Sequence, residues 1–329
     1  VLPELSGDER YSIEFDGVFM NSTVYINGHA LGTRPYGYSS FCYDLTPYLQ
    51  AGENLIAVRC DNAEQPNSRW YAGCGIYRNV RLVRTSDTHV AYNGDFVTTP
   101  VAGDRSLVRV QTDIESPETS GLKVRYRILD HSGRGIASAW GTCADGTAGG
   151  ELELRGTRLW SPDSPYLYTL RTELYSGDVL KDIHDTRFGV RSISWDKDKG
   201  FFINGENVKM LGVCMHHDMG CIGTAVHRRA LERQLEKLKS MGVNAIRTSH
   251  NPPAPELLDL CDEMGFLVMD EAMDMWRKRK TRYDYARFFD EWHKADVQDF
   301  IRRDRNHPSV VMWSIGNEIP EQGSKEGAE

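Results

Sequence analysis

The sequence predicts a multidomain protein of the β plus α/β class, with a β-sandwich, an immunoglobulin-like β-sandwich and a β/α domain built on a parallel sheet. Its 329 residues exceed the size of an ordinary single domain. Up to about residue 193, short segments alternate apolar with polar residues, as half-buried strands do. From about residue 194, strand and helix patterns alternate, which is typical of a parallel sheet covered by helices.

The first predicted domain covers residues 1–86. Apolar and polar residues alternate in three segments separated by turn residues: 11–19, 22–32 and 54–60. We expect a β-sandwich whose loops are rich in aromatic residues and asparagine. Aromatic rings of this kind can stack on a sugar, although most are explained more simply as filling the edge of the sandwich. Arg69 and Trp70 are the loop residues that we retain as candidates for a site.

The second predicted domain covers residues 87–193. It repeats the strand pattern, with loops rich in Gly, Ser, Asp and Pro, in segments that include 107–114, 122–129 and 166–175. Several short strands at this spacing favour an immunoglobulin-like sandwich. The segment contains no constellation of chemically active residues, so we expect it to act as a spacer or brace.

The third predicted domain covers residues 194–329. Strand patterns occupy residues 207–216, 243–250, 266–272 and 310–318. Helical patterns lie between them, at residues 225–242, 255–265 and 288–305. This alternation predicts a parallel sheet joined by right-handed crossovers, with the carboxyl ends of all four strands at one edge.

Charge and hydropathy exclude several classes of partner. The net charge is −8, and the 39 Lys and Arg residues are scattered along the chain, which argues against nucleic acid or an anionic membrane as partner. No segment is apolar enough to span a membrane, and the first residues lack a signal-peptide pattern. Periplasmic and cytoplasmic locations both stay open, as does a homo-oligomer.

The seven cysteines predict free thiols, because they include no CxxC pair and an odd number cannot all pair internally. A metal site is the alternative where Cys, His and Asp side chains lie close together in residues 214–221. Zinc ligands usually come in tighter pairs, so we expect no metal there.

Polar residues follow each of the four predicted barrel strands. The apolar run that begins at Val310 ends abruptly in Asn317 and Glu318, which makes Glu318 the leading catalytic candidate. The other strand ends supply His216, His217, Asp218, Arg247, His250, Asn251, Asp270 and Glu271. Their joint occurrence at one edge predicts a site more strongly than any single residue does. Taken alone, His216 could be a core histidine and Arg247 could form a buried bridge with Asp270.

Two long motifs carry a resemblance to a known family. Residues 244–253, NAIRTSHNPP, and residues 305–318, RNHPSVVMWSIGNE, resemble the paired signatures of glycoside hydrolase family 2. The resemblance extends over nearly the whole chain. It implies a sugar-binding jelly roll that lacks its first strands, then an immunoglobulin-like domain, then a truncated TIM barrel. Within the family the sequence is most similar to β-galactosidases, and β-glucuronidases and β-mannosidases share the same barrel motifs.

The resemblance implies retaining hydrolysis of a terminal β-D-galactoside in an oligosaccharide or other β-glycoside. Glu318 would be general acid and then general base, working with a second carboxyl group about 5–5.5 Å away. Burial beside Trp313 would keep Glu318 protonated at the start. Asn317 would hold the sugar 2-hydroxyl, and Arg247 would orient the nucleophile. The remaining substrate-binding candidates are His216, His250, Asp270 and Trp70.

The sequence departs from the family pattern at three places. The family's nucleophile is a Glu near the end of the seventh barrel strand, and no Glu here replaces it, so we expect a fragment that is inactive alone. The stretch Met273–Lys278 lacks the Glu and His that hold magnesium in some β-galactosidases, so we expect no metal and no cofactor. Ser68 and Arg69 stand where some galactosidases have an acidic residue, which makes galactose a less secure prediction.

Two other functions stay open. The chain could belong to a carbohydrate-binding relative that has lost catalysis, or to a β-glucuronidase or β-mannosidase of the same family. A hydrolase of another kind, using Ser249, His250 and Asp270, is disfavoured because neighbouring residues on a strand end point in opposite directions.

Overall fold

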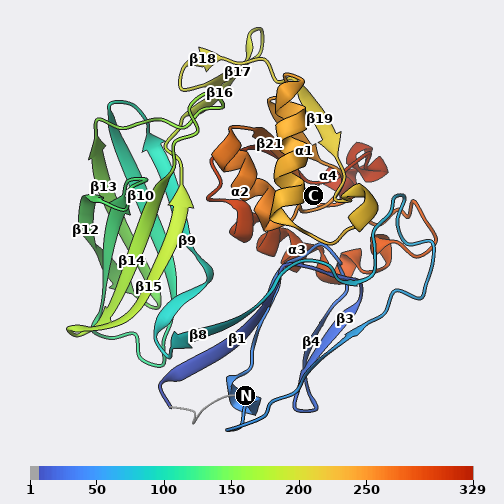
Figure 1. Ribbon diagram of the computed structural model, residues 1–329, viewed down its shortest axis with the longest axis horizontal. Coiled ribbons are helices and arrows are strands. Elements are labelled where there is room, and N and C mark those ends of the chain that lie inside the picture. The colour runs from blue at the N-terminus through green and yellow to red at the C-terminus, as the bar shows by residue number, and fades with distance from the viewer. Residues whose placement is uncertain (1–6, 329) are drawn as a thin grey trace.

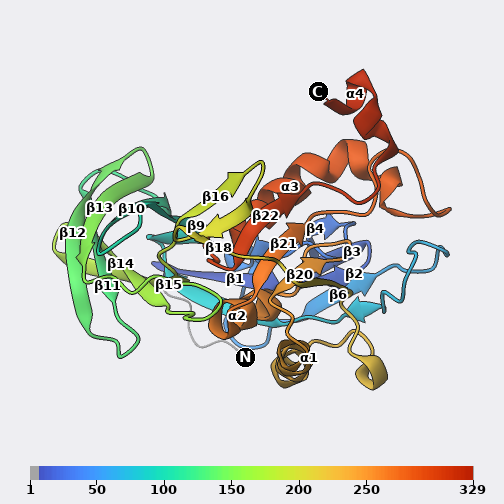
Figure 2. The same cartoon turned by 90° about the horizontal axis from the view of Figure 1, so that it is seen from above.

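A computed structural model describes residues 7–328, which form three bodies (Figure 1). The N-terminal strands pack below the C-terminal β/α body, and the second sandwich lies to one side. Figure 2 shows that this second sandwich occupies one end of the molecule, away from strands β20 (Ala245–Thr248), β21 (Leu267–Glu271) and β22 (Val310–Ser314). The fold class predicted from the sequence is confirmed.

The first sandwich contains two three-stranded sheets and a small two-stranded one. One sheet has the order β5-β1-β8, with bounds Phe41–Asp44, Glu9–Phe15 and Val80–Ser86. The other has the order β4-β3-β6, with bounds His29–Arg34, Ser22–Ile26 and Ile56–Cys60. The small pair is β2 (Val18–Phe19) and β7 (Gly75–Ile76), and the short 3-10 helix η1 spans Thr46–Tyr48. Alternate residues of β1 are buried, as the period of a strand requires.

The second sandwich is a single seven-stranded antiparallel sheet that curls over one core. Its strand order is β15-β14-β11-β12-β13-β10-β9. In chain order the bounds are His89–Val101, Arg105–Glu115, Leu122–Leu129, Gly135–Ala144, Thr147–Arg155, Tyr168–Ser176 and Val179–Phe188. The core consists of alternate residues such as Val108, Val124 and Leu170, which are fully buried.

A small antiparallel sheet, β16-β17-β18 (Ile193–Asp196, Gly200–Ile203 and Glu206–Asn207), leads into the β/α body. There, four parallel strands stand in the order β19-β20-β21-β22, with bounds Gly212–Met215, Ala245–Thr248, Leu267–Glu271 and Val310–Ser314. The helices between them are α1 (Arg228–Ser240), α2 (Pro255–Met264) and α3 (Phe289–Asp304). The remaining short elements are η2 (Gly220–Ile222), η3 (Tyr285–Arg287), η4 (Pro320–Gly323) and α4 (Lys325–Ala328). The predicted alternation of strands and helices is therefore confirmed.

Strand β22 is less buried than the sequence predicts. Val310 and Val311 are buried, but Trp313 is 41% exposed, and Ile315, just after the strand, is 62% exposed. The reason is that β22 pairs with β21 on one side and with no other strand of the described residues 7–328. The indole of Trp313 instead packs edge-on against Phe300 of α3, with ring centroids 5.1 Å apart.

Buried charges fix the first sandwich against the β/α body. The guanidinium of Arg78 is buried and donates to the backbone carbonyls of Tyr38, Pro252 and Pro253. Arg34 makes an ion pair with Asp296 of α3 at 3.1 Å. Because unpaired buried donors are costly, these contacts hold the sandwich loops in place beside the strand ends.

His307 and Asp262 give a prediction for stability. Burial alone would lower the pKa of His307, but the Asp262 carboxylate, 2.6 Å from Nδ1, outweighs burial and raises that pKa to about 9. The pKa of His307 in the folded protein lies above its ordinary value. The ion pair therefore contributes fully to the free energy of unfolding below about pH 6.5, and this contribution is lost as pH rises through about 9. We expect His307→Gln to lower the free energy of unfolding by about 2–3 kcal/mol at pH 6 and by less at pH 10.

Denaturant unfolding of the wild type and the variant at both pH values measures this difference. His227→Gln, which changes an exposed histidine at the start of α1, is the matched control and should be close to neutral. Equal losses for His307→Gln at pH 6 and pH 10 would contradict the ion pair.

All seven cysteines are free thiols, as predicted. Among residues 7–328, no helix is both long and apolar enough to cross a membrane.

Candidate active site

The pleat of the parallel strands sorts the predicted site residues onto two faces. Residues opposite each other across β20, β21 and β22 share a face, and neighbours along one strand point to opposite faces. Arg247, Glu271 and Ser314 therefore meet on the face away from the helices. Asp270 and Trp313, which are paired in register, lie on the other face, toward α3.

Glu271 is the centre of a buried polar network. Its carboxylate accepts hydrogen bonds from Arg247 Nε at 2.9 Å and from Ser314 Oγ at 2.6 Å, and it lies 2.6 Å from His250 Nδ1. Burial alone would raise the pKa of Glu271, but the hydrogen bonds from His250, Ser314 and Arg247 outweigh it and lower that pKa. The carboxylate is fully buried and ionised, so it can orient Arg247 and His250 together.

The structure corrects the prediction for Asp270. Its side chain is fully buried, and its Oδ1 accepts from Thr248 Oγ1 at 3.3 Å, on the helix-facing side of the sheet. Burial, followed by the neighbouring Asp304 carboxylate, raises its pKa well above the ordinary value. Asp270 therefore cannot reach a substrate at the strand ends, and the partner of Arg247 is Glu271 rather than Asp270.

Asn317 is held by three charged groups. Its Oδ1 accepts from Arg247 Nη2 at 2.9 Å, and its Nδ2 donates to Asp274 Oδ1 at 2.9 Å. Its backbone carbonyl accepts from Lys280 Nζ at 2.6 Å. These contacts fix the amide and leave one of its two N–H groups for another acceptor.

Asp274 links this network to the first sandwich. Its carboxylate accepts from Arg69 Nε at 2.9 Å and from Lys280 Nζ at 3.1 Å. Burial alone would raise the pKa of Asp274, but the bonds from Arg69, Asn317 and Lys280 outweigh it and lower that pKa. Arg69 is thus fixed at the site although it belongs to a loop of another domain.

Glu318 follows β22 and extends into the open part of the site. Its side chain is 72% exposed, so the expected burial beside Trp313 is wrong. Trp313 lies on the helix-facing side of the sheet and packs against Phe300 instead. The carboxylate of Glu318 lies 3.5 Å from Arg69 Nη1 and 3.9 Å from Lys280 Nζ. Its backbone φ is 46°, in the left-handed region that a residue with a side chain seldom adopts and that functional sites often contain.

Aromatic side chains form one wall of the site. The ring of Trp70 lies 5.0 Å from that of His216 and 5.6 Å from that of His250, and the two histidine rings are 5.6 Å apart. Trp70 Nε1 donates to Tyr38 OH at 3.0 Å. Burial and the neighbouring His250 lower the pKa of His216, so it is neutral at pH 7.

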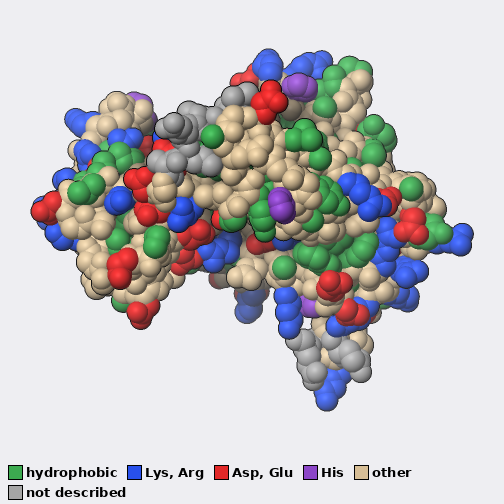
Figure 3. Space-filling model, turned by 90° about the horizontal axis from the view of Figure 1, so that it is seen from below, with side chains coloured by type: hydrophobic (Ala, Val, Ile, Leu, Met, Phe, Trp, Pro, Cys, Tyr) green, Lys and Arg blue, Asp and Glu red, His purple; other side chains and the backbone are tan. Residues whose placement is uncertain are grey.

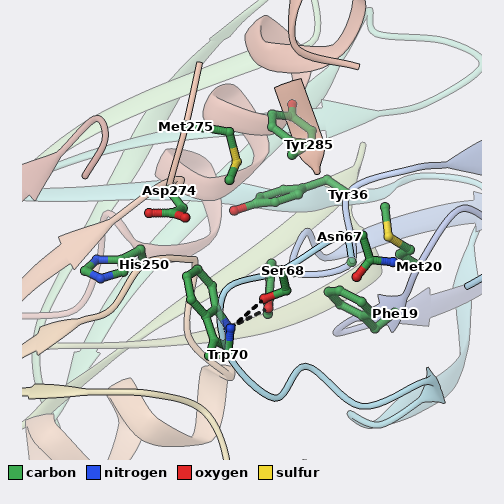
Figure 4. Close-up of a pocket in the computed structure, with 12 residues that line it drawn as sticks. Phe19, Met20, Tyr36, Asn67, Ser68, Trp70, His250, Asp274, Met275 and Tyr285 are labelled. Atoms are coloured by element: carbon green, nitrogen blue, oxygen red, sulfur yellow. Dashed lines mark hydrogen bonds between the residues drawn. The ribbon is translucent and has the colours of Figure 1, made fainter. Parts of the chain in front are cut away.

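Figure 4 shows Trp70, His250 and Asp274 around the pocket beside this wall, together with Tyr36, Met275 and Tyr285. These side chains combine a flat aromatic surface, an imidazole and a carboxylate, which are groups that contact sugars, but the cavity between them measures about 30 Å³, so a sugar would contact their outer faces rather than fill it.

Neither alternative chemistry is assembled. No group of three or more His, Cys, Asp or Glu side chains within residues 7–328 is arranged to hold a metal ion. Ser249, His250 and Asp270 do not form a triad, because His250 Nδ1 contacts Glu271 and the Ser249 hydroxyl donates to the Arg247 carbonyl.

The structure brings together Glu318, Asn317, Arg247, His250, His216 and Trp70, and it leaves out Asp270 and Trp313. Sequence reasoning missed Asp274 and Lys280, and it treated Glu271 as part of the strand end without a role. Asp274 and Lys280 lie in an irregular segment, where periodicity gives no direction for a side chain. The only available signal was their position shortly after the third barrel strand.

Three family models match consecutive parts of the chain. Glycosyl hydrolases family 2, sugar binding domain, matches residues 2–86, and Glycosyl hydrolases family 2 matches residues 88–191. Glycosyl hydrolases family 2, TIM barrel domain, matches residues 196–327. The chain therefore belongs to glycosyl hydrolase family 2, and the resemblance drawn from its two motifs is confirmed.

Its similarity to individual members is high. It is 55% identical, over 95% of its length, to a Bacteroides ovatus protein named beta-galactosidase BoGH2A, and it spans 38% of that protein. It is 46% identical to a putative beta-glucuronidase of Formosa agariphila, over 93% of this chain and 30% of the relative. A solved beta-glycosidase from Bacteroides vulgatus matches with a TM-score of 0.94 and 41% identity, over 99% of this chain and 42% of the solved one. The chain thus spans less than half the length of these relatives.

Proposed function

We propose that this chain is part of a retaining exo-β-glycosidase that removes terminal β-D-galactosyl residues. The observation that carries the proposal is the carboxylate of Glu318 after a barrel strand, close to Arg69 and Lys280 and next to an ordered Asn317. Carboxylates presented at this end of a barrel act on substrate. The relative with 55% identity is named a beta-galactosidase, which supports galactose as the sugar.

In this mechanism the Glu318 carboxyl group gives its proton to the glycosidic oxygen while the bond from that oxygen to the anomeric carbon breaks. A second Glu, outside this chain, attacks the anomeric carbon and forms the covalent intermediate. Glu318, now a carboxylate, then takes a proton from the water that displaces the nucleophile. Nothing in this sequence of steps needs a metal or a cofactor.

The neighbouring residues orient the reacting groups. The remaining N–H of Asn317 would donate to the sugar 2-hydroxyl, because its other N–H is given to Asp274. Arg247, held by Glu271 and Asn317, would present its one remaining guanidinium N–H, on Nη1, to the nucleophile. Trp70, His216 and His250 would line the subsite for the terminal sugar.

A panel of aryl β-glycosides tests this function on the full-length protein. We expect the highest kcat/KM with the β-galactoside and, by proton NMR, a β-configured sugar as the first product. A first product of α-configuration would contradict the retaining mechanism. Absence of hydrolysis across the panel would favour a carbohydrate-binding relative that has lost catalysis.

A β-glucuronidase is the second candidate. Arg69 and Lys280 both face Glu318, and cations at this position suit a sugar that carries a carboxylate. A relative with 46% identity is named a putative beta-glucuronidase. The same panel separates these candidates, because a β-glucuronidase would hydrolyse the β-glucuronide at least tenfold faster than the β-galactoside.

Lys280→Met is expected to lower kcat/KM about tenfold, because Asn317 and Asp274 both lose an ammonium that positions them. The variant also removes one of the groups that lower the pKa of Asp274, so that pKa rises. Asp274 then takes up a proton at a higher pH than in the wild type, so the acid limb of the plot of kcat/KM against pH shifts to higher pH.

Rates measured from pH 4 to pH 9 with an aryl β-galactoside show both effects. The matched control is Lys278→Met, which changes an exposed lysine two residues away and should leave rate and profile unchanged. An unchanged acid limb for Lys280→Met would show that Asp274 does not matter for turnover.

A further inference from the structure

A short segment beside the site is strongly basic. Residues 277–287, between β21 and α3, contain six Lys or Arg residues, although the whole chain has a net charge of −8. This segment is called the basic loop below. Both Figure 1 and Figure 2 place it at the right-hand end of the molecule, where Figure 3 shows Lys and Arg side chains gathered on the surface.

The basic loop is held in one shape by its own backbone contacts. The buried side chain of Asp284 accepts from the backbone N–H groups of Lys280 and Thr281, both at 2.7 Å. The N–H of Tyr283 donates to the carbonyl of Pro66 in the first sandwich at 3.0 Å. The backbone that carries the cations is therefore fixed, so binding a ligand has to order only their side chains.

Half of these cations are not neutralised. Lys280 pairs with Asp274, Arg277 with Asp290 and Arg287 with Glu64. The other three are exposed and have no ion-pair partner within residues 7–328: Lys278, Arg279 and Arg282. Three like charges in five consecutive residues repel one another, so their proximity favours binding of an anion.

The basic loop lies alongside the segment that carries Glu318. Trp276 Nε1 donates to the carbonyl of Ile315 at 2.9 Å, and the N–H of Lys278 donates to Glu321 Oε1 at 2.6 Å. These two contacts flank Glu318 on both sides in the sequence. Glu318 is proposed to protonate the leaving oxygen, so exposed side chains around the segment that carries Glu318 can contact the group attached to that oxygen.

We propose that the basic loop binds an acidic leaving group, namely an oligosaccharide that carries carboxylate or sulfate groups on the residues adjoining the cleaved sugar. The inference rests on the proposed function, which supplies the direction of the leaving group. Arginine forks match the two oxygens of a carboxylate or sulfate, and a lysine adds a point charge. The surface thereby selects the chain from which the terminal sugar is removed.

The test is a calorimetric titration of full-length protein carrying Glu318→Gln, so that no probe is consumed. The probes are an oligogalacturonate, a sulfated galactan oligosaccharide and a neutral cello-oligosaccharide of the same length. We expect at least one acidic probe to bind at least tenfold more tightly than the neutral one, and to weaken between 50 and 500 mM NaCl. Whichever acidic probe binds identifies carboxylate or sulfate as the recognised group.

Substitutions within the basic loop locate the binding. The triple variant Lys278→Ala, Arg279→Ala and Arg282→Ala should lose at least tenfold of the acidic affinity. The matched control, Lys199→Ala, Arg233→Ala and Lys237→Ala, removes the same charge from exposed positions elsewhere and should bind as before. In a protein with native Glu318, the triple variant should also leave kcat for a neutral aryl β-galactoside unchanged.

Three results would overturn the proposal. Neutral and acidic probes could bind equally, the loop variant could retain full affinity, or an oligonucleotide of equal charge could bind as tightly as the acidic sugar, which would indicate a general polyanion surface. Failure of the proposed function is separate, because it would appear as absence of hydrolysis in the aryl glycoside panel while the titration still reports on binding.

Discussion

Glu318→Gln is expected to lower kcat for a sugar leaving group about 10³-fold, because the leaving oxygen loses its proton donor. A glutamine keeps the size of the side chain and cannot supply or take up that proton. A 2,4-dinitrophenyl glycoside leaves without protonation, so formation of the covalent intermediate from this substrate should be nearly unaffected. Breakdown of the intermediate still needs a base to activate water, and it becomes the slow step.

Steady-state rates with the two leaving groups, with and without sodium azide, measure both halves of this prediction. Azide needs no base, so it should restore turnover of the activated substrate and give a β-glycosyl azide. Glu291→Gln, an exposed glutamate of α3, is the matched control and should leave both rates unchanged. If both substrates slowed equally and azide had no effect, Glu318 would not be the acid/base.

The same variant separates an enzyme from a binding protein. A protein that only binds carbohydrate has no need of a proton donor at residue 318, so Glu318→Gln would preserve its affinity and there would be no turnover to lose.

Glu271→Gln is expected to lower kcat/KM about 100-fold and the free energy of unfolding by about 2–3 kcal/mol. The carboxylate is fully buried and bonds Arg247, His250 and Ser314 together. Glutamine replaces one acceptor oxygen with a donor and removes the charge, so the partly buried guanidinium of Arg247 loses its counter-ion. Both the site geometry and the packing of the strand ends depend on this one group.

Kinetics with an aryl β-galactoside and denaturant unfolding are measured on the same preparation. Asp259→Asn, which breaks the partly exposed pair with Arg187, is the control and should cost less than about 1 kcal/mol with no change in rate. A stability loss without a rate loss would restrict Glu271 to a structural role.

The sequence alone was enough to predict the order of strands and helices, and to place the candidate site at the carboxyl ends of the parallel strands. Apolar periodicity located all four barrel strands, and Glu318 was proposed as a site residue because a carboxylate follows the last of them. Periodicity could not decide between Asp270 and Glu271. Adjacent residues on a strand face opposite sides of the sheet. If the predicted strand is shifted by one residue, the side chain assigned to the site becomes the one assigned to the helix-facing side.

Two further parts of the site depend on contacts that are remote in sequence. Arg69 reaches Asp274 and Glu318 only because the first sandwich docks on the β/α body. The exposure of Trp313 depends on how far the sheet extends beyond β22, which local patterns do not describe.

The bond between Arg69 and Asp274 joins residues separated by 205 positions along the chain. Contacts at such separations form late, because closing a long loop costs entropy before any other contact compensates for it. Each sandwich and each β/α unit can therefore acquire its secondary structure before Arg69 meets Asp274. During refolding of the full-length protein, the circular dichroism signal should recover ahead of catalytic activity, with domain docking as the step that separates them.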